Sequence, residues 1–536
     1  ASTLDVAATG TEVDPTTLTQ AANGELASAD RTYGGFGGAP KFPHPLGLAF
    51  LLRMQTRRRS GMGNDSANGA AFTAIDPDLL DLVTLTLDRM AAGGIYDQIG
   101  GGFHRYATDA IWLVPHFEKM LYDNALLAPV YLHAWQLTGN PRYREVCEAT
   151  LDYTLREMTD KTGAFYSTQD ADSEGEEGKF YIWSPAELRA ALGDEQSAVV
   201  ERLWGVSARG NFEGRNILHL ARTEAEVASE TGHTEAEVHE IAQGARATLY
   251  QIRAQRVWPG LDDKTITAWN ALMLRAFAEA ADILDRDDYH RAAIANADFL
   301  IGQMRNDSGR LLRTWRLGVS KGDAYLEDYA ALVNGLLSVY ALTGESRYFR
   351  VARERADEMI ARFWDEDAQS FYDTASDAEQ LIGRPRELTD NATPAGSSLA
   401  AEALLRLAAY TGEARYHEYA ARVLVPLAPL MAKHPSGFGQ FLCALDNLIG
   451  PLYEVALIGA HDDAGTQALR AALRSHYLPR LVFAQVGPGD DIAQAAVPLL
   501  ANRPLVEDRA ALYVCQGFVC QQPVTTPDEA LALLKA

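Results

Sequence analysis

The sequence predicts a mainly α-helical chain whose helices pair into an (α/α)6 toroid, a closed ring of six helical hairpins. Three observations support this fold class: a repeated turn signature, a count of twelve helical stretches, and helices that are apolar on more than one face. The chain has 536 residues, 47% of them apolar, which is enough for a core of that size.

The repeated signature is a turn containing Gly or Asp, followed by a helix with a tyrosine in its first turn. It occurs as LTGNPRY (137–143), LDRDDY (284–289), LTGESRY (342–348) and YTGEARY (410–416). The last three tyrosines are 59 and 68 residues apart. Two helices and two loops fit a repeat of that length, so the sequence predicts a tandem of helical hairpins.

Hydrophobic periodicity extends the count of helices to twelve. Several are apolar on more than one face, as in the run AWNALML (268–274), which is typical of helices that pack on both sides. An inner ring of six and an outer ring of six would explain this pattern. The predicted helices are 16–28, 44–57, 76–92, 118–138, 141–158, 265–284, 287–304, 325–343, 345–363, 394–411, 413–431 and 438–449.

One insertion interrupts the helical pattern at about residues 159–262. It opens with two β-prone runs, GAFYST (163–168) and GKFYIW (178–183), which an acidic loop joins, and we predict that they pair as a β-hairpin. A more polar, helix-prone stretch follows near 223–253. The toroid is therefore expected to span residues 1–450 and to carry this insertion.

The last part of the chain, residues 451–536, has a different pattern. YEVALIG (453–459), a helix near 464–475, RLVFAQV (480–486) and AALYVC (510–515) alternate strand, helix and strand. This alternation predicts a small appended α/β element.

Composition excludes some classes of partner. Lys plus Arg number 48 and Asp plus Glu 72, so the formal net charge is −24. That charge repels phosphates, and we expect neither a nucleic-acid partner nor an anionic membrane surface. No apolar run approaches the roughly 20 residues of a membrane-spanning helix. The first residues lack the pattern of a signal peptide, and the expected location is cytoplasmic. Oligomeric state is not predicted.

The four cysteines predict no metal centre. Cys147 and Cys443 lie in apolar helical patterns, where a free cysteine is usually part of the core. Cys515 and Cys520 are spaced C-x4-C with no second Cys or His pair nearby, whereas a zinc site needs about four ligands. The spacing allows a disulfide without implying one. No external cofactor is expected.

The densest group of chemically useful residues lies between 93 and 124. A loop rich in glycine and aromatic residues (93–106) precedes WLVPHFEKMLYDN (112–124), which leads into a helix. Glycines let backbone approach a ligand, aromatic rings can stack on a sugar, and His and carboxylates can exchange protons. No strand precedes the glycines, so a nucleotide-binding loop is not predicted. The alternative is a purely structural turn.

Other predicted inner helices also begin with polar residues. These starts are Asp262–Thr265 with Trp269 and Asn270, Glu327–Asp328, and Asp390–Ser397. Taken singly, each is best explained as a helix cap. A closed ring would bring all of them to one rim, where they could line a pocket.

The acidic loop STQDADSEGEEG (167–178) has three interpretations. It could be a solvated hairpin tip, or an oxygen-rich cation site, although it lacks the full EF-hand spacing. In the third interpretation, Asp170 or Asp172 leans over the mouth of the barrel as a catalytic carboxylate.

Six motifs, in order over about residues 30–530, resemble the thioredoxin-domain-containing, spermatogenesis-associated protein family (YyaL-type in bacteria). The resemblance implies a six-hairpin glycosidase-like toroid related to N-acylglucosamine 2-epimerase. Members usually carry a thioredoxin-like domain, and this chain shows no C-x-x-C motif, so no thiol–disulfide role is carried over. The motifs are GGFGGAPKFPHP (34–45), the segment 93–127, YSTQDADSEGEEGKFYIW (166–183), LDDKTITAWNALML (261–274), YLEDYA (325–330) and YVCQGFVCQQPV (513–524).

These observations favour a carbohydrate-active enzyme, hydrolase-like, acting on a small saccharide. Hydrolysis needs one protonated and one ionised carboxyl group beside the glycosidic bond. The catalytic candidates are Asp172 or Asp170 as one carboxyl group and Glu118, Asp123 or Asp263 as its partner, and His116 and His104 would orient or bind the sugar. The candidates for substrate binding are Tyr96, Asp97, Arg105, Tyr106, Trp112, Tyr122, Asn124, Lys264, Trp269, Asn270, Glu327, Asp328 and Ser397.

Two alternatives stay open at the level of sequence. A sugar epimerase or isomerase would use His104 and His116 as a pair, because the pKa of histidine lies near neutrality. A non-catalytic binding or scaffold protein would use the same rim residues only as caps and ion pairs.

Overall fold

The computed structural model describes residues 13–14, 16–59, 78–379 and 383–534. Its centre is a closed ring of six inner helices, each of which contacts the next, with the last returning to the first. The predicted toroid is confirmed. In ring order these helices are α2 (Pro45–Arg59), α4 (Leu121–Thr138), α9 (Thr267–Leu284), α11 (Leu326–Thr343), α13 (Gly396–Thr411) and α16 (Gly439–Ile449).

Outer helices alternate with the inner ones along the chain. The outer α12 buries one stripe, including Tyr348, Ala352 and Met359, whereas α11 is buried almost all round because it packs on both sides. The outer helices are α1 (Thr17–Ser28), α3 (Leu79–Ala92), α5 (Pro141–Glu157), α10 (Asp287–Gln303), α12 (Ser346–Phe363) and α14 (Ala414–Leu424), which η1 (Val425–Leu427) and α15 (Ala428–Lys433) extend.

The repeated turn signature joins an inner helix to the following outer helix. Gly139, Gly344 and Gly412 end α4, α11 and α13 in the left-handed conformation, each with φ near 72°. Glycine adopts this conformation without a Cβ penalty. Because inner and outer helices alternate, all six inner helices run in the same direction. Their first turns therefore lie at one end of the barrel, which we call the rim.

The insertion differs from its prediction in one respect. Residues 163–168 and 178–183 do not pair with each other: Phe165 bridges to Thr159, and Trp183 bridges to Asn216. A short hairpin lies between the two runs, formed by β5 (Asp172–Ser173) and β6 (Glu176–Glu177). Phe180 and Tyr181 lie in a turn rather than a strand, and together with Ile182 they share a small buried cluster with Phe117.

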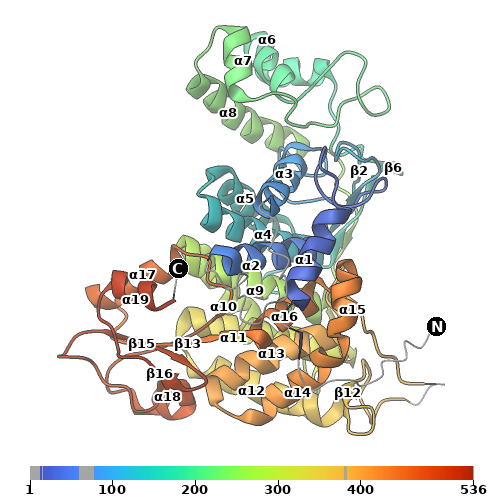
Figure 1. The fold of residues 1–536 in the computed structure, drawn as a ribbon. Helices are drawn as coiled ribbons and strands as arrows, with labels where there is room; N and C mark the ends of the chain where they lie inside the picture. The colour runs from blue at the N-terminus through green and yellow to red at the C-terminus, as the bar shows by residue number, and fades with distance from the viewer. Residues whose placement is uncertain (1–12, 15, 60–77, 380–382, 535–536) are drawn as a thin grey trace.

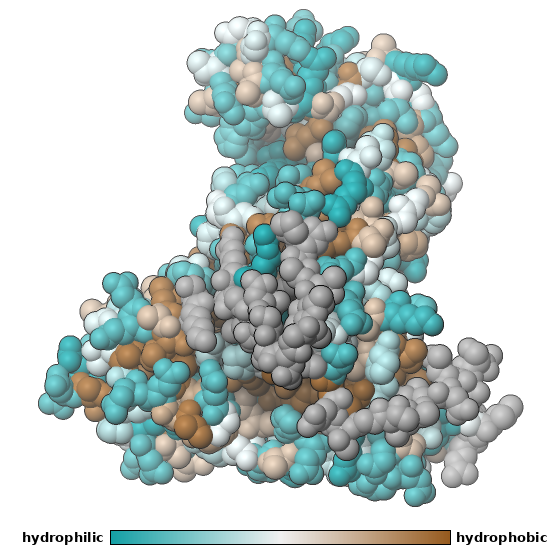
Figure 2. Space-filling view, in the orientation of Figure 1, coloured by the Kyte–Doolittle hydropathy of each residue, from teal (hydrophilic) through white to brown (hydrophobic). Residues whose placement is uncertain are grey.

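The remainder of the insertion is helical, as predicted for residues 223–253. α6 (Pro185–Leu203), α7 (Glu224–Thr231) and α8 (Glu235–Arg253) share a small core of their own, centred on residues such as Trp183 and Trp204. These helices stand at the top of the molecule, away from the C-terminal element at the lower left (Figure 1). Hydrophilic side chains dominate their visible surface (Figure 2).

The predicted C-terminal α/β element is also present. Its sheet has the order β14 (Leu481–Val486), β13 (Tyr453–Ile458), β15 (Ala511–Gln516), β16 (Val519–Cys520), with only the first pair parallel. Tyr453, Val455 and Leu457 face a core shared with α17 (Ala464–Arg474) and α19 (Pro527–Leu534), whereas Ala456 and Ile458 join the core of the barrel. A domain boundary at residue 450 stays a prediction.

Cys515 and Cys520, which face each other across β15 and β16, form a disulfide. In the described part of the chain, no helix is long and apolar enough to span a membrane. The remaining short elements are β1 (Tyr106–Ala107), β2 (Pro115–His116), β3 (Lys119–Met120), β4 (Thr168–Gln169), β7 (Leu261–Asp262), β8 (Thr265–Ile266), β9 (Leu312–Arg316), β10 (Val319–Asp323), β11 (Trp364–Asp365), β12 (Ser370–Phe371), α18 (Asp491–Ala496), η2 (Pro435–Gly437) and η3 (Pro498–Leu500).

Candidate functional site

A group of five polar residues lies where the segment 93–124 enters α4 at the rim. We call Arg105, His116, Glu118, Tyr122 and Asp123 the rim cluster. β1 pairs with β2, with Tyr106 opposite His116, and the Arg105 N–H donates to the Glu118 carbonyl. This small sheet holds the side chains of the loop beside the first turn of the helix.

Glu118 is the central contact of the rim cluster. One of its oxygens, Oε2, accepts from Arg105 Nη1 at 3.1 Å and lies 3.5 Å from His116 Nε2. The other ring nitrogen of His116, Nδ1, lies 2.7 Å from Glu177 Oε1 of the insertion hairpin. His116 thus links a barrel carboxylate to the insertion.

Asp123 has the opposite environment. It lies in the first turn of α4, is 5% exposed, and its Oδ2 is buried without a hydrogen-bond partner among the described residues. Burial raises the pKa of Asp123 well above its ordinary value; Arg105 opposes this shift and Glu118 adds to it. A raised pKa favours the protonated form of the carboxyl group, which is the form that can donate a proton.

Aromatic rings border the rim cluster. The Tyr106 ring stacks on His116 with centroids 5.2 Å apart, and Trp269 meets Tyr122 edge-on at 4.9 Å. Burial and the neighbouring Asp123 raise the pKa of Tyr122 to about 12. Tyr106 and Trp269 are partly exposed, so they could offer faces to a sugar ring.

The acidic loop lies next to the rim cluster. β3 pairs with β4 so that Lys119 faces Gln169 and Met120 faces Thr168. Extending this antiparallel register by one residue places Asp170 opposite Glu118. Asp170 is exposed, and its Oδ1 accepts from the Ala171 N–H at 2.7 Å.

Asp172 is also exposed, but it belongs to the β5–β6 hairpin, where it faces Glu177. Asp263 and Lys264 lie just before α9 and form ion pairs with other residues. Asp263 Oδ1 accepts from Arg316 at 2.5 Å, and Lys264 pairs with Asp262 at 3.3 Å.

Several predicted binding residues instead tie the rim together, as the capping interpretation expects. Asn124 Oδ1 accepts from the Phe103 N–H, and its amide nitrogen donates to the Phe103 carbonyl. Asn270 does the same with Phe165. Asp328 is fully buried and accepts from the Ala268 N–H at the start of the neighbouring helix. These three side chains are anchors for loops and helix starts.

The two remaining rim predictions lie beside these anchors. Glu327 accepts from Arg313 at 2.7 Å, and the same Arg313 nitrogen lies 2.9 Å from Asp328. Ser397 is buried in the first turn of α13, and its Oγ has no hydrogen-bond partner in the described chain.

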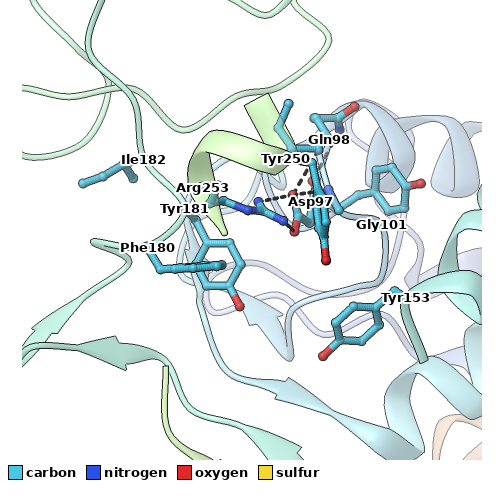
Figure 3. A network of polar contacts seen from close by, with 12 residues as sticks. Asp97, Gln98, Gly101, Tyr153, Phe180, Tyr181, Ile182, Tyr250 and Arg253 are labelled. Atoms are coloured by element: carbon cyan, nitrogen blue, oxygen red, sulfur yellow. Dashed lines mark hydrogen bonds and ion pairs between the residues drawn. The ribbon is translucent and has the colours of Figure 1, made fainter. Parts of the chain in front are cut away.

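Asp97 does not belong to an exposed site, and we correct its prediction as a sugar-binding residue. It lies in a buried network in which Arg253 of α8 donates to both of its oxygens at 2.8 Å (Figure 3). Lys119 donates to the same carboxylate at 2.9 Å. The aromatic rings of Phe180 and Tyr181 lie beside the guanidinium group. The network fastens the insertion to the barrel loop.

Three further predicted site residues, His104, Tyr96 and Trp112, are buried in contacts within the loop, and we do not place them in the rim cluster. His104 is 2% exposed, its Nδ1 lies 2.8 Å from the Phe117 carbonyl oxygen, and burial lowers its pKa to about 3. Tyr96 packs on Phe103, and Trp112 is fully buried with its Nε1 donating to a backbone carbonyl. Rings enclosed in this way cannot stack on a ligand.

Sequence reasoning missed a cavity of about 290 Å³ inside the inner ring. Charged residues of the inner helices line it, among them Arg275, Glu279, Glu402 and Arg406. Arg275 donates to both oxygens of Glu402, at 3.0 and 2.9 Å, and to Glu279 at 2.7 Å. The signal in the sequence was a charged residue within a helix that is otherwise apolar on all faces.

In the described residues, no three His, Cys, Asp or Glu side chains are grouped so that they could hold a metal ion. The fold and the site together define an (α/α)6 toroid protein with acidic and aromatic side chains at one rim. No family model matches the chain.

Comparison with curated proteins gives the family. The chain is 32% identical over 544 residues to human spermatogenesis-associated protein 20, a match that covers 94% of this chain and 67% of that protein. An uncharacterized protein of Caenorhabditis elegans is 29% identical over 537 residues, covering 94% and 71%. The chain belongs to the spermatogenesis-associated protein 20 family.

Solved structures whose backbones partly superpose on this chain include a mannanase and a sugar epimerase. A GH76 α-mannanase of Bacteroides thetaiotaomicron has 10% sequence identity and a TM-score of 0.40, over 82% of this chain and 84% of that one. A sugar epimerase from a ruminal bacterium has 11% identity and a TM-score of 0.31, over 78% and 98%. The assignment of the toroid rests on the ring of helix contacts itself.

Proposed function

We propose that the rim cluster is the active site of a carbohydrate-active enzyme that hydrolyses a small saccharide. The observation that carries this proposal is the contrast between two neighbouring carboxyl groups. Asp123 is buried and its Oδ2 has no partner in the described chain, whereas Glu118 is paired with Arg105. Carboxyl groups whose environments favour opposite protonation states are the requirement for acid and base roles in glycoside hydrolysis.

In this proposal Asp123 is the general acid. Its proton passes to the glycosidic oxygen as the bond to the anomeric carbon breaks, and the sugar acquires positive charge. Glu118 is the partner carboxylate, with Asp170 as the neighbouring alternative. It stabilises this charge, or it accepts a proton from the water molecule whose oxygen bonds to the anomeric carbon. His116 orients Glu118, while Tyr106 and Trp269 offer faces for the sugar ring.

The epimerase alternative loses support from the position of its histidines. A His pair would need two rings that can both exchange a proton with the substrate. His104 is buried, has a pKa lowered to about 3, and has its Nδ1 against a backbone carbonyl, so it is neutral at any physiological pH. Only His116 of the two lies at the rim, and we therefore prefer hydrolysis.

The test is turnover of a panel of aryl glycosides and disaccharides by the full chain. We expect wild-type protein to hydrolyse at least one member of the panel, and Glu118→Gln to lower kcat by about 10²-fold or more. Asp307→Asn is the matched control, because Asp307 is an exposed loop residue far along the chain from the rim cluster. If the wild type neither binds nor hydrolyses any saccharide, the enzyme proposal fails and a scaffold role takes its place.

A further inference from the structure

The cavity inside the inner ring is separate from the rim cluster. At the rim end it is lined by Pro45 and Pro394, and at the far end the segment 476–483 of the C-terminal element closes it. There Tyr477 stacks on His133 with centroids 4.4 Å apart. Its volume of about 290 Å³ is close to the lower end of small-molecule sites, so it suits a compact ligand.

The charges that line this cavity are mainly positive, although the whole chain carries a net charge of −24. Five arginines face it, against three acidic residues. The arginines are Arg53, Arg275, Arg406, Arg470 and Arg474, and the acidic residues are Glu279, Asp282 and Glu402.

Four of these arginines have a carboxylate partner. Arg53 pairs with Asp446, which lies behind the wall of the cavity, at 2.7 Å. Arg275 pairs with Glu279 and Glu402. Arg470 and Arg474 pair with Asp282 at 2.6 and 2.7 Å.

Arg406 differs from the other four. Its guanidinium donates only to neutral groups, namely the carbonyl and side-chain oxygens of Asn334 and the hydroxyl of Ser338. No carboxylate of the described residues lies within ion-pair distance of it. Burial and the nearby Arg275 lower the pKa of Arg406, whereas Tyr410, Glu402 and Glu279 oppose this shift. The side chain is not completely covered, and it lines the open space.

We infer that this cavity binds a small organic anion, a carboxylate or a phosphate, through the guanidinium of Arg406. Arginine offers two parallel N–H groups that match the oxygens of either anion. Such a ligand would supply the direct ion-pair partner that Arg406 lacks among the described residues. Glu402 lies in the same wall, and both of its oxygens accept hydrogen bonds from Arg275.

The site is distinct from the proposed catalytic centre. Arg406 lies ten residues into α13, which begins at Gly396 at the rim, so it lies about 15 Å below the start of that helix. A monosaccharide whose glycosidic oxygen contacted Asp123 would not reach it. The inference therefore stands independently of the proposed hydrolysis.

The experiment is isothermal titration of the full chain, at constant ionic strength, with glucuronate, glucose 6-phosphate and neutral glucose. We expect saturable binding of at least one of the two anions and none of glucose at the same concentrations. Preference between the two anions identifies the source of the negative group. Absence of saturable binding by both anions would overturn the inference.

Substitution of Arg406 tests whether this residue binds the anion. Arg406→Gln is expected to weaken anion binding at least tenfold, whereas Arg350→Gln, on the exposed face of the outer helix α12, leaves it unchanged. If Arg406→Gln does not fold, Arg406→Lys keeps the charge and should still weaken binding, because the forked donor is lost. Binding of wild-type strength by a folded Arg406 variant would refute the assignment.

Discussion

Arg253 of the inserted helix α8 donates two hydrogen bonds of 2.8 Å to Asp97 of the barrel loop, and both side chains are almost completely buried. The pair joins segments 156 residues apart in the chain. The insertion is thus fastened to the segment that also carries the rim cluster. Substitution of either residue should lower the stability of the protein and also disturb the geometry of the rim cluster.

Replacement of Arg253 by Met should strongly destabilise the protein. The substitution leaves the buried Asp97 with Lys119 as its remaining cationic partner, and breaking a buried ion pair typically costs about 3–5 kcal/mol. Denaturant unfolding followed by circular dichroism measures the change. Arg350→Met, at an exposed position, is the control, and a loss for Arg253→Met that is no larger than for the control would contradict this role.

His104 should make stability depend on pH. Its pKa is lowered from 6.5 to about 3 in the folded protein, so between these values the unfolded chain binds more protons. The free energy of unfolding should therefore rise as the pH rises from about 3 to 6.5, and the stabilising effect is complete above that window. Unfolding of wild type and His104→Gln across this range checks the sign. The variant should show a smaller slope, and an unchanged slope would contradict the buried neutral ring.

Asp123→Asn should stabilise the folded protein at neutral pH. The pKa of Asp123 is higher in the folded state than in the unfolded state. The contribution of Asp123 to the free energy of unfolding is therefore fully present below about pH 4, and it is lost as the pH rises through the folded-state pKa. An amide removes the cost of ionising or protonating the buried group, which we expect to be about 1–3 kcal/mol. Thermal unfolding at pH 7 and pH 4 measures this gain. An increase in Tm that is larger at pH 4 than at pH 7 would contradict the raised pKa of Asp123.

Asp390 should hold two helix starts together. One of its oxygens accepts from the Ala395 N–H and Ser398 hydroxyl at the start of α13, and the other accepts from the N–H groups of Gln440 and Phe441 in α16. Asp390→Ala is expected to cost about 2–4 kcal/mol, because several buried donors lose their acceptor. Asp307→Asn serves as the surface control in the same unfolding assay. A cost below about 0.5 kcal/mol would refute the anchoring role.

Most of the fold follows from the sequence because periodicity and turn chemistry are local. The glycine turns at 139, 344 and 412 mark the ends of inner helices, and the helices around them lie within a few residues of their predicted bounds. The run 178–183 misled the prediction. Phe180 and Tyr181 in this run are buried in a cluster with Phe117 rather than paired in a strand. That packing depends on residues about 60 positions earlier in the chain, so the local pattern does not predict it.

The location of the site stays a prediction. The run 116–123 lies at the start of α4, and the structure brings His116, Glu118 and Arg105 together there. Asp123 and Asp97 are both buried, but Asp97 has cationic partners and Asp123 Oδ2 has no hydrogen-bond partner among the described residues. The sequence alone does not predict this difference. The difference depends on Arg253, far away in the chain. Arg406 was overlooked because the lumen of a ring exists only after the ring has closed.

The most direct test of the proposed mechanism is the pH dependence of kcat/KM for wild type and Asp123→Asn on the best saccharide of the panel. With Asp123 as general acid, wild-type activity should fall at high pH as the group ionises. Asp123→Asn should lose about 10²–10⁴-fold in kcat/KM, together with this alkaline limb, while remaining folded. A folded Asp123→Asn protein with wild-type turnover and an unchanged pH profile would contradict the account.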